Sequence, residues 1–426
     1  YYYFAARYGL AYRLDNKTVV RAGYGISFQS WPDNLNLYAT NYPLKQNNAF
    51  QSLSSYTQAL EPDGSGASMA AGFPAPFIAT IPANGIIPAN TPQLLASTYY
   101  TINTNWKAPY THSFNAAVQR SLPGGFVLDV AYVGNVGIRQ PQSYNINAGL
   151  VAGAGAAGQP QYAPFKRTAQ TWIFKQAGSN YNSLQVKLDR RFTNGLSATS
   201  SYTFQKAMGY TTSSGSGVGN TNFYTDFSRN YSVLGNNRKH TFVQSFIYEL
   251  PFGKSKKWLN SGVASWVAGG WQVTGVLSLE SGTPFSIGAS SASLNAPGSS
   301  GTVTQLANTN GTFHKLKGIG NSLWFDPSSF SQPSAATTGI SGLGNSGQNA
   351  YIGPGYFNLD GALFRKFAIT ERVGLELRAE AFSLTNTPQF GNPSNNISNA
   401  DFGHINFTNG NATGNRVTEL AGKITF

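Results

Sequence analysis

Apolar and polar residues alternate one by one along several stretches of the chain, most regularly near its end. Every second residue of Val373–Ala381 is apolar, and charged residues stand between them. The preceding run, Phe357–Phe367, alternates in the same way. A period of two is the period of a strand, whereas a helix repeats every 3.6 residues. The short segment Ala368–Arg372 joins the two runs, so together they predict a β-hairpin.

The same period predicts about nine further strands, giving roughly eleven in all. They are Tyr2–Leu14, Val20–Phe28, Tyr110–Leu122, Phe126 to about Val136, Leu184–Asp189, Leu196–Gln205, His240–Leu250, Trp271–Glu280 and Leu420–Phe426. The dipeptide Asn194-Gly195 is the strongest short hairpin signal in the chain. Strands of about eleven residues are long enough to cross a bilayer at a tilt.

Short and long connections alternate along the predicted strands. The long ones are rich in proline, glycine or asparagine, and they include Gln29–Ala108 and Ser281–Pro354. Pro251–Gly270 is a longer connection with two tryptophans among the otherwise short ones. A soluble sandwich has short turns at both ends. Transmembrane barrels instead combine short periplasmic turns with long extracellular loops. The fold class we predict is therefore all-β, an antiparallel transmembrane β-barrel.

Composition narrows the class of protein further. Only 11% of residues are charged, against about 25% in a typical soluble domain, and no apolar run approaches the ~18 residues of a spanning helix. The chain has no cysteine, so it has no disulfide framework and no thiolate metal site. The net charge of +13 raises the question of nucleic acid. The basic residues are scattered, with Lys254, Lys256 and Lys257 as the densest group, so we expect no nucleic-acid partner.

Strand parity predicts that residues 1–426 form the carboxyl-terminal part of one larger barrel. If the long loops are outside, the first and last predicted strands both run towards the periplasm. A closed bacterial barrel has an even number of strands with both chain ends on the periplasmic side. At least one strand is therefore expected to precede Tyr1. A first strand at Tyr2–Leu14 would also leave an unpaired edge, which is costly in lipid. The chain begins at Tyr1 without Met or a signal peptide, which fits this expectation.

Four segments resemble the Oar-like TonB-dependent receptors of Gram-negative bacteria: Tyr181–Phe192, Gly195–Phe204, Tyr248–Gly253 and Arg378–Thr387. The resemblance implies a barrel of about twenty-two strands in the outer membrane, of which these would be the later half. It implies ligand capture by outer loops and import coupled to TonB through an amino-terminal plug region, which we expect to be missing here. Leu420, Ile424 and the terminal Phe426 resemble the signal read by the outer-membrane assembly machinery.

Two groups of strand residues are candidates for functional surfaces. Asp360, Lys366, Glu376, Arg378 and Glu380 are expected to form a lumen-facing charge ladder of cross-strand ion pairs, which we favour over a transport role. Aromatic residues near strand ends are expected to form a girdle at the membrane interface. These are Trp31, Tyr110, Tyr202, Phe204, Tyr248, Trp271, Tyr356 and Phe367. The alternative use of such residues is carbohydrate stacking on a soluble β-protein.

Motifs for catalysis or cofactor binding are weak. Gly153–Gly158 and Gly342–Gly347 match a dinucleotide fingerprint but lie in predicted loops, not between a strand and a helix. The four histidines are far apart and lack metal-ligand spacing, and no Gly-x-Ser-x-Gly elbow occurs. We therefore expect no enzyme activity, no cofactor and no metal.

Three functions remain open at this point. The first is a TonB-dependent receptor or transporter, whose partners would be outer-membrane lipid, lipopolysaccharide, the assembly machinery, TonB and an unidentified ligand. The second is a structural or adhesive envelope barrel without import. The third is a secreted glycan-binding β-protein, which the apolar face on every strand disfavours. The loop Ser394–Asn411 is a candidate outer ligand surface, but its composition names no ligand.

Overall fold

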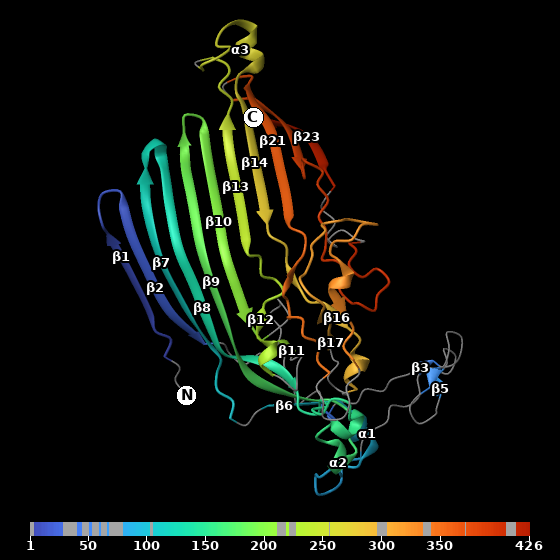
Figure 1. Ribbon diagram of the computed structural model, residues 1–426. Helices are drawn as coiled ribbons and strands as arrows, with labels where there is room; N and C mark the ends of the chain where they lie inside the picture. The colour runs from blue at the N-terminus through green and yellow to red at the C-terminus, as the bar shows by residue number, and fades with distance from the viewer. Residues whose placement is uncertain are drawn as a thin grey trace.

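The main element is a curved antiparallel sheet of eleven strands in sequential order (Figure 1). The computed structural model describes residues 4–28, 41–44, 51–52, 59–60, 66–67, 80–102, 105–210, 219–220, 227–254, 256–295, 305–334, 342–370, 372–405 and 415–426. The strands of the main sheet are β1 (Arg7–Arg13), β2 (Thr18–Phe28), β7 (Tyr110–Leu122), β8 (Phe126–Asn145), β9 (Thr171–Thr193), β10 (Leu196–Gly209), β13 (His240–Glu249), β14 (Trp271–Glu280), β21 (Tyr356–Ala368), β22 (Gly374–Phe382) and β23 (Val417–Thr425).

The predicted number and order of strands are confirmed. β7 and β14 have the bounds that the sequence pattern predicts. β13 differs from its predicted bounds by one residue at one end, and β21 and β22 differ by one residue at each end. The turn between β9 and β10 has Asn194 and Gly195 at positive φ, 52° and 79°, as the tightest hairpins require. β1 begins only at Arg7, while Tyr1–Tyr3 lie outside the described residues.

The strand register divides the main sheet into an apolar and a polar face. One row of neighbours crosses nine strands: Tyr12, Val20, Val118, Val130, Val186, Tyr202, Phe242, Leu279 and Phe357. The row beside it reads Arg13, Val19, Gln119, Asp129, Lys187, Ser201, Val243, Ser278 and Asn358. Because side chains alternate between faces along a strand, these two rows represent opposite sides of the sheet.

The strand carboxylates follow the same division. Every acidic residue of the eleven strands lies on the polar face: Asp129, Asp189, Glu249, Glu280, Asp360, Glu376, Glu380 and Glu419. A hollow of about 450 Å³ opens on that face, lined by side chains such as Thr199, Ser245 and Thr274 from neighbouring strands. The sheet therefore curls around its polar face and presents its apolar face outwards.

The two ends of the sheet differ in their connections (Figure 1). At one end are the short turns, the carboxyl terminus and helix α3 (Gly262–Ala268). At the other end the long connections gather with α1 (Pro92–Ala96) and α2 (Tyr162–Phe165). The short strands are β3 (Gln51–Ser52), β4 (Ala59–Leu60), β5 (Gly66–Ala67), β6 (Tyr99–Ile102), β11 (Gly219–Asn220), β12 (Ser232–Val233), β15 (Pro284–Phe285), β16 (Gly288–Ala289), β17 (Gln305–Leu306), β18 (Asn308–Thr309), β19 (Phe330–Ser331) and β20 (Tyr351–Ile352). No helix in the described ranges is long and apolar enough to cross a membrane.

β8 and β9 are much longer than predicted. At about 3.3 Å per residue, the 20 residues of β8 extend roughly 65 Å, well beyond the ~10 residues needed to cross a bilayer. A bulge interrupts the pair between Gly137 and Gln140. Beyond it, Gln142 and Asn145 are buried among loops, so this part of β8 has no apolar face and the period-two signal disappears.

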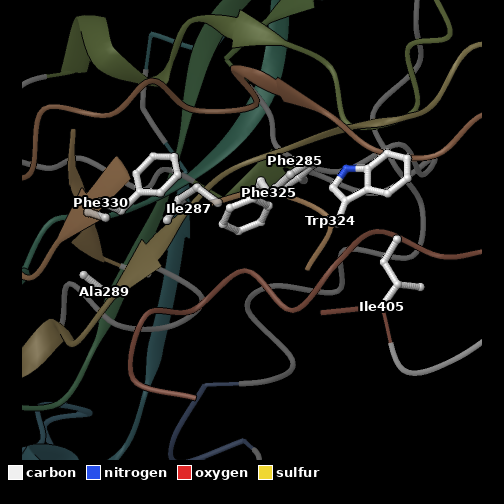
Figure 2. Packing of buried hydrophobic residues seen from close by; sticks show 8 residues of the cluster. Phe285, Ile287, Ala289, Trp324, Phe325, Phe330 and Ile405 are labelled. Carbon is white, nitrogen blue, oxygen red and sulfur yellow. The ribbon is translucent and has the colours of Figure 1, made fainter. Parts of the chain in front are cut away.

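The described residues of the connections Ser281–Pro354 and 383–416 are not merely irregular, as the sequence pattern suggested, but pack around a core (Figure 2). We call this unit the aromatic loop body, defined by Phe285, Ile287, Ala289, Ala307, Trp324, Phe325, Phe330 and Ile405. The strand pairs β15–β20, β16–β17 and β18–β19 frame it. Its apolar residues are irregularly spaced along the chain, which is why periodicity did not reveal it.

Candidate functional site

The charge ladder lies across β21 and β22 on the polar face. Glu376 is its centre: one carboxylate oxygen is 2.7 Å from Nε of Arg378, and the other is 3.4 Å from Nζ of Lys366. Arg378 also reaches Glu380 at 3.3 Å. The Glu376 side chain is largely buried, whereas Lys366 is mostly exposed. Only the pair of Lys366 with Glu376 joins neighbouring strands, as predicted for a cross-strand pair, whereas the two pairs of Arg378 lie within β22.

Asp360 is not part of these ion pairs, although the sequence analysis grouped it with them. Its Oδ1 accepts hydrogen bonds from the backbone N–H of Ser383 at 2.8 Å and from Nδ2 of Asn358 at 3.0 Å. Ser383 follows β22 and has a positive φ of 49°. The carboxylate therefore fixes the point where the chain leaves β22, and its distance along β21 from Lys366 separates it from the other charges.

At the long-loop end of the apolar face, aromatic residues pack against histidines. Tyr110 lies 5.2 Å from His112 between ring centroids, and Phe204 lies 5.2 Å from His240. The Tyr202 hydroxyl is 2.8 Å from Nδ1 of His240. The sequence analysis named these three aromatic residues but not their histidine partners. His112 is two residues from Tyr110 on β7, whereas His240 meets Tyr202 and Phe204 only through the strand register.

The short-turn end of the apolar face carries the predicted girdle residues Tyr248, Trp271 and Phe367. Arg365 lies among them, with its guanidinium carbon 4.0 Å from the centroid of Phe367. Tyr356 lies at a strand end as predicted, since it begins β21, but it pairs with Glu280 and shares the polar face with Lys366. It therefore does not belong to a girdle on the apolar face. Trp31 lies outside the described residues.

The last strand places its apolar residues on the apolar face. Leu420 pairs with Ala379 and Ile424 with Leu375, and Phe426 follows directly after β23. Leu420 and Phe426 are 86% and 96% exposed, so they are open to contact from outside the chain. β1, at the opposite edge of the sheet, is exposed along its whole length.

The aromatic loop body holds an open cavity of about 810 Å³. Phe330 and Phe402 form the apolar part of its wall. Polar groups of the lining come from Ser290, Ser293 and Gln332. Elsewhere in the loop body, the Nζ of Lys315 lies 4.5 Å from the centroid of Trp324, and partial burial lowers the pKa of that lysine. Aromatic surface with a few hydroxyl and amide groups suits binding of a ligand.

A second open cavity, of about 560 Å³, lies at the bulge of β8. Arg139 borders it with Tyr210, Phe227 and Tyr231, and the rings of Tyr210 and Phe227 stack 4.9 Å apart. The Arg139 guanidinium is 5.6 Å from the ring of Tyr110. This cavity therefore begins where the apolar face ends and the loops begin.

Buried amides organise the loop between β8 and β9, which we call the amide loop body (residues 145–171). Asn147 donates from Nδ2 to the carbonyls of Ala169 at 2.8 Å and Arg167 at 3.2 Å, and its Oδ1 accepts from the N–H of Gln161 at 2.9 Å. Asn147 is fully buried. Side-chain amides thus replace an apolar core in this loop.

A family comparison identifies the main sheet. The family model described as an outer membrane beta barrel domain matches residues 1–418. The chain belongs to this outer-membrane β-barrel domain family. Among curated proteins none matches it.

Solved structures similar to this family member are larger proteins. The ferric-catecholate import receptor Fiu from K12 E. coli is 11% identical with a TM-score of 0.41, over 98% of this chain and 34% of that one. The outer membrane transporter YddB from Escherichia coli is 7% identical with a TM-score of 0.47, over 96% and 39%. The siderophore receptor PiuA from Acinetobacter baumannii is 10% identical with a TM-score of 0.41, over 99% and 35%. The chain thus spans little more than a third of their lengths.

Family membership confirms the predicted outer-membrane location.

The outer-membrane β-barrel sheet and its loops carry little that resembles a catalytic centre. In the described ranges, no group of three His, Cys, Asp or Glu side chains stands close enough to hold a metal. Both glycine motifs lie in connections between strands, and the first forms a 3₁₀ turn at Gly155–Gly158. The surfaces described above are suited to binding and to membrane contact.

Proposed function

We propose that this chain is the barrel part of a TonB-dependent receptor, in which extracellular loops capture a ligand and import is coupled to energy from the inner membrane. The observation that carries the proposal is the two-faced sheet, with folded loop bodies at one end only. An apolar outer face suits a membrane wall, and the polar inner face suits a lumen. The resemblance of Tyr181–Phe192 and Arg378–Thr387 to Oar-like receptors narrows the class from barrels in general to this one.

In this proposal the short turns lie in the periplasm and the loop bodies outside the cell. The chain forms the carboxyl-terminal part of the barrel domain, and further strands pair with the exposed edges at β1 and β23, because unpaired backbone groups are very costly in lipid. The charge ladder then faces the lumen. Leu420, Ile424 and Phe426 serve recognition by the assembly machinery, and lipopolysaccharide contacts the outer rim.

A barrel that adheres without importing would have the same sheet, and no described residue favours it specifically. The secreted glycan-binding alternative does not fit an outer-membrane protein. Import therefore has to be separated from adhesion by experiment.

The test uses a single cysteine at Gln332, an exposed residue at the rim of the 810 Å³ cavity, labelled with a fluorophore in cells that display the protein. A panel of ferric siderophores, cobalamin, maltodextrins and oligopeptides is screened for quenching. The compound that quenches is then followed as a radiolabelled probe into paired hosts with and without TonB. Uptake only in the TonB-positive host supports the proposal. Binding with no TonB-dependent uptake contradicts it and leaves adhesion.

A further inference from the structure

Among the connections at the short-turn end, residues 250–270 between β13 and β14 form a distinct surface. This segment contains α3 and exposes several large apolar side chains, including Val263 at 78% and Trp266 at 68%. It also carries Lys254, Lys256 and Lys257 and has no acidic residue. A short turn needs none of these features, since the other hairpins at this end are closed by a few residues.

Arg365 attaches α3 to the lipid-facing side of the sheet. The strand register places Arg365 on the apolar face, opposite Trp271. Its Nη1 donates to the carbonyl of Val267 at 2.6 Å, and its Nη2 donates to the carbonyl of Trp266. Trp271 adds a bond from Nε1 to the same Val267 carbonyl at 3.0 Å. The carboxyl end of α3 thereby accepts hydrogen bonds from both Nη groups of this guanidinium.

The apolar side chains of this segment continue the lipid-facing surface. Trp266 lies 6.2 Å from Phe367 between ring centroids, and Phe367 belongs to the aromatic residues at this end of the apolar face. Figure 1 shows α3 standing just past the ends of β13 and β14, where a membrane surface meets water. Tryptophan favours this interface, because its ring is apolar and its N–H is polar.

The lysines supply the charge that complements phosphate. Lys256 pairs with Glu249 at 3.0 Å, whereas Lys257 lies with its ammonium 5.2 Å from the ring of Trp258, and Lys254 is exposed beside them. We propose that residues 250–270 form an interfacial foot that binds the headgroups of anionic glycerophospholipids in the membrane leaflet at the short-turn end. The occupant follows from continuity with the lipid-facing sheet and from the positive charge of Lys254 and Lys257, which remains after Glu249 neutralises Lys256.

The foot does not depend on import, because it needs only the membrane position of the sheet. The experiment reconstitutes the protein in bilayers of phosphatidylcholine with phosphatidylglycerol, one of the two lipids being brominated in each sample. Bromine quenches only tryptophans that it contacts. The fluorescence of Trp266 is obtained as the difference between the unaltered protein and Trp266→Phe. In the same way, Trp271→Phe gives the fluorescence of Trp271, which lies on the adjoining lipid-facing sheet.

Brominated phosphatidylglycerol is expected to quench Trp266 with an apparent affinity about 25-fold above that of brominated phosphatidylcholine, since each of two basic residues near an anionic surface contributes about fivefold. The combined change Lys254→Gln and Lys257→Gln should bring the ratio close to one. The matched control, Lys166→Gln with Lys317→Gln at the long-loop end, should leave it unchanged.

Two results would overturn the proposal. Equal quenching by both lipids that the lysine changes do not alter would show contact with lipid but no recognition of its headgroup. If neither brominated lipid quenches Trp266 while Trp271 is quenched, the foot faces water or a protein partner. If neither tryptophan is quenched, the membrane wall itself is contradicted, so the two failures are distinguishable.

Discussion

Replacing Phe325 with alanine should open the aromatic loop body and leave the membrane sheet intact. Phe325 is fully buried, and the rings of Phe285, Phe313, Phe330 and Phe402 surround it at centroid distances of 5.2–6.2 Å. An aromatic side chain buries about 150–200 Å², which at about 25 cal/mol per Å² is worth roughly 4–5 kcal/mol. Measured Phe→Ala changes in cores of about 3–5 kcal/mol agree with this figure.

Hydrogen exchange followed by mass spectrometry measures the opening of the loop body locally. A loss of 3–5 kcal/mol corresponds to exchange faster by about 10² to 10³ or more in peptides that contain residues 285–289 and 324–330. Peptides of β14 should exchange as in the unaltered protein, because the loop core and the sheet share few contacts. On a gel, the unheated Phe325→Ala protein should still migrate differently from the heated protein, because the folded barrel sheet is retained.

Phe325→Leu is the matched control, since a smaller apolar side chain that retains most of the volume should cost less than about 1.5 kcal/mol. Unchanged exchange in Phe325→Ala would refute the packing described for this core. Faster exchange in β14 as well would refute its independence from the sheet.

Three further outcomes are expected. Leu277→Arg on the apolar face should lower the free energy of unfolding of the bilayer-inserted sheet, measured in urea, by about 2–4 kcal/mol. Thr274→Arg on the polar face should lower it by less than about 1 kcal/mol. Similar losses of stability in the two variants would contradict the assignment of faces. Asn147→Ala removes three hydrogen bonds and should loosen the amide loop body by about 2–4 kcal/mol, seen as faster exchange confined to residues 145–171. The Ser328 hydroxyl and N–H hold the pKa of Asp326 below its ordinary 3.8, so this carboxylate stabilises the aromatic loop body above about pH 4 and the effect is lost as the pH falls through the lower folded-state pKa. Tryptophan emission should show that acid transition, and Asp326→Asn should lack it.

The sequence predicted the main sheet because half of each strand faces lipid and the other half faces polar surroundings. That difference produces the period of two in Val373–Ala381 and Trp271–Glu280. Even the opposite faces of Leu359 and Asp360 are as predicted. Beyond Gly137 the period is lost, because loops bury both sides of β8.

The loops and the foot could not be predicted in the same way. Phe285, Phe325 and Ile405 are far apart in the chain and meet only through the fold. Trp266 lies in the connection between β13 and β14 and Arg365 in β21, and their contact depends on which face of β21 carries the arginine. Asp360 was grouped with the charge ladder from its sequence spacing alone, whereas its partner Ser383 is fixed by the turn after β22.

Scanning β14 with single nitroxide labels tests the two-faced membrane wall most directly. The chain has no cysteine, so Val273→Cys, Thr274→Cys, Leu277→Cys and Ser278→Cys each give one defined site in the outer membrane. At positions 273 and 277 the nitroxide should collide mainly with oxygen, which concentrates in lipid. At positions 274 and 278 it should collide mainly with a water-soluble nickel complex. Equal accessibility at all four positions, or the reverse alternation, would contradict the barrel account.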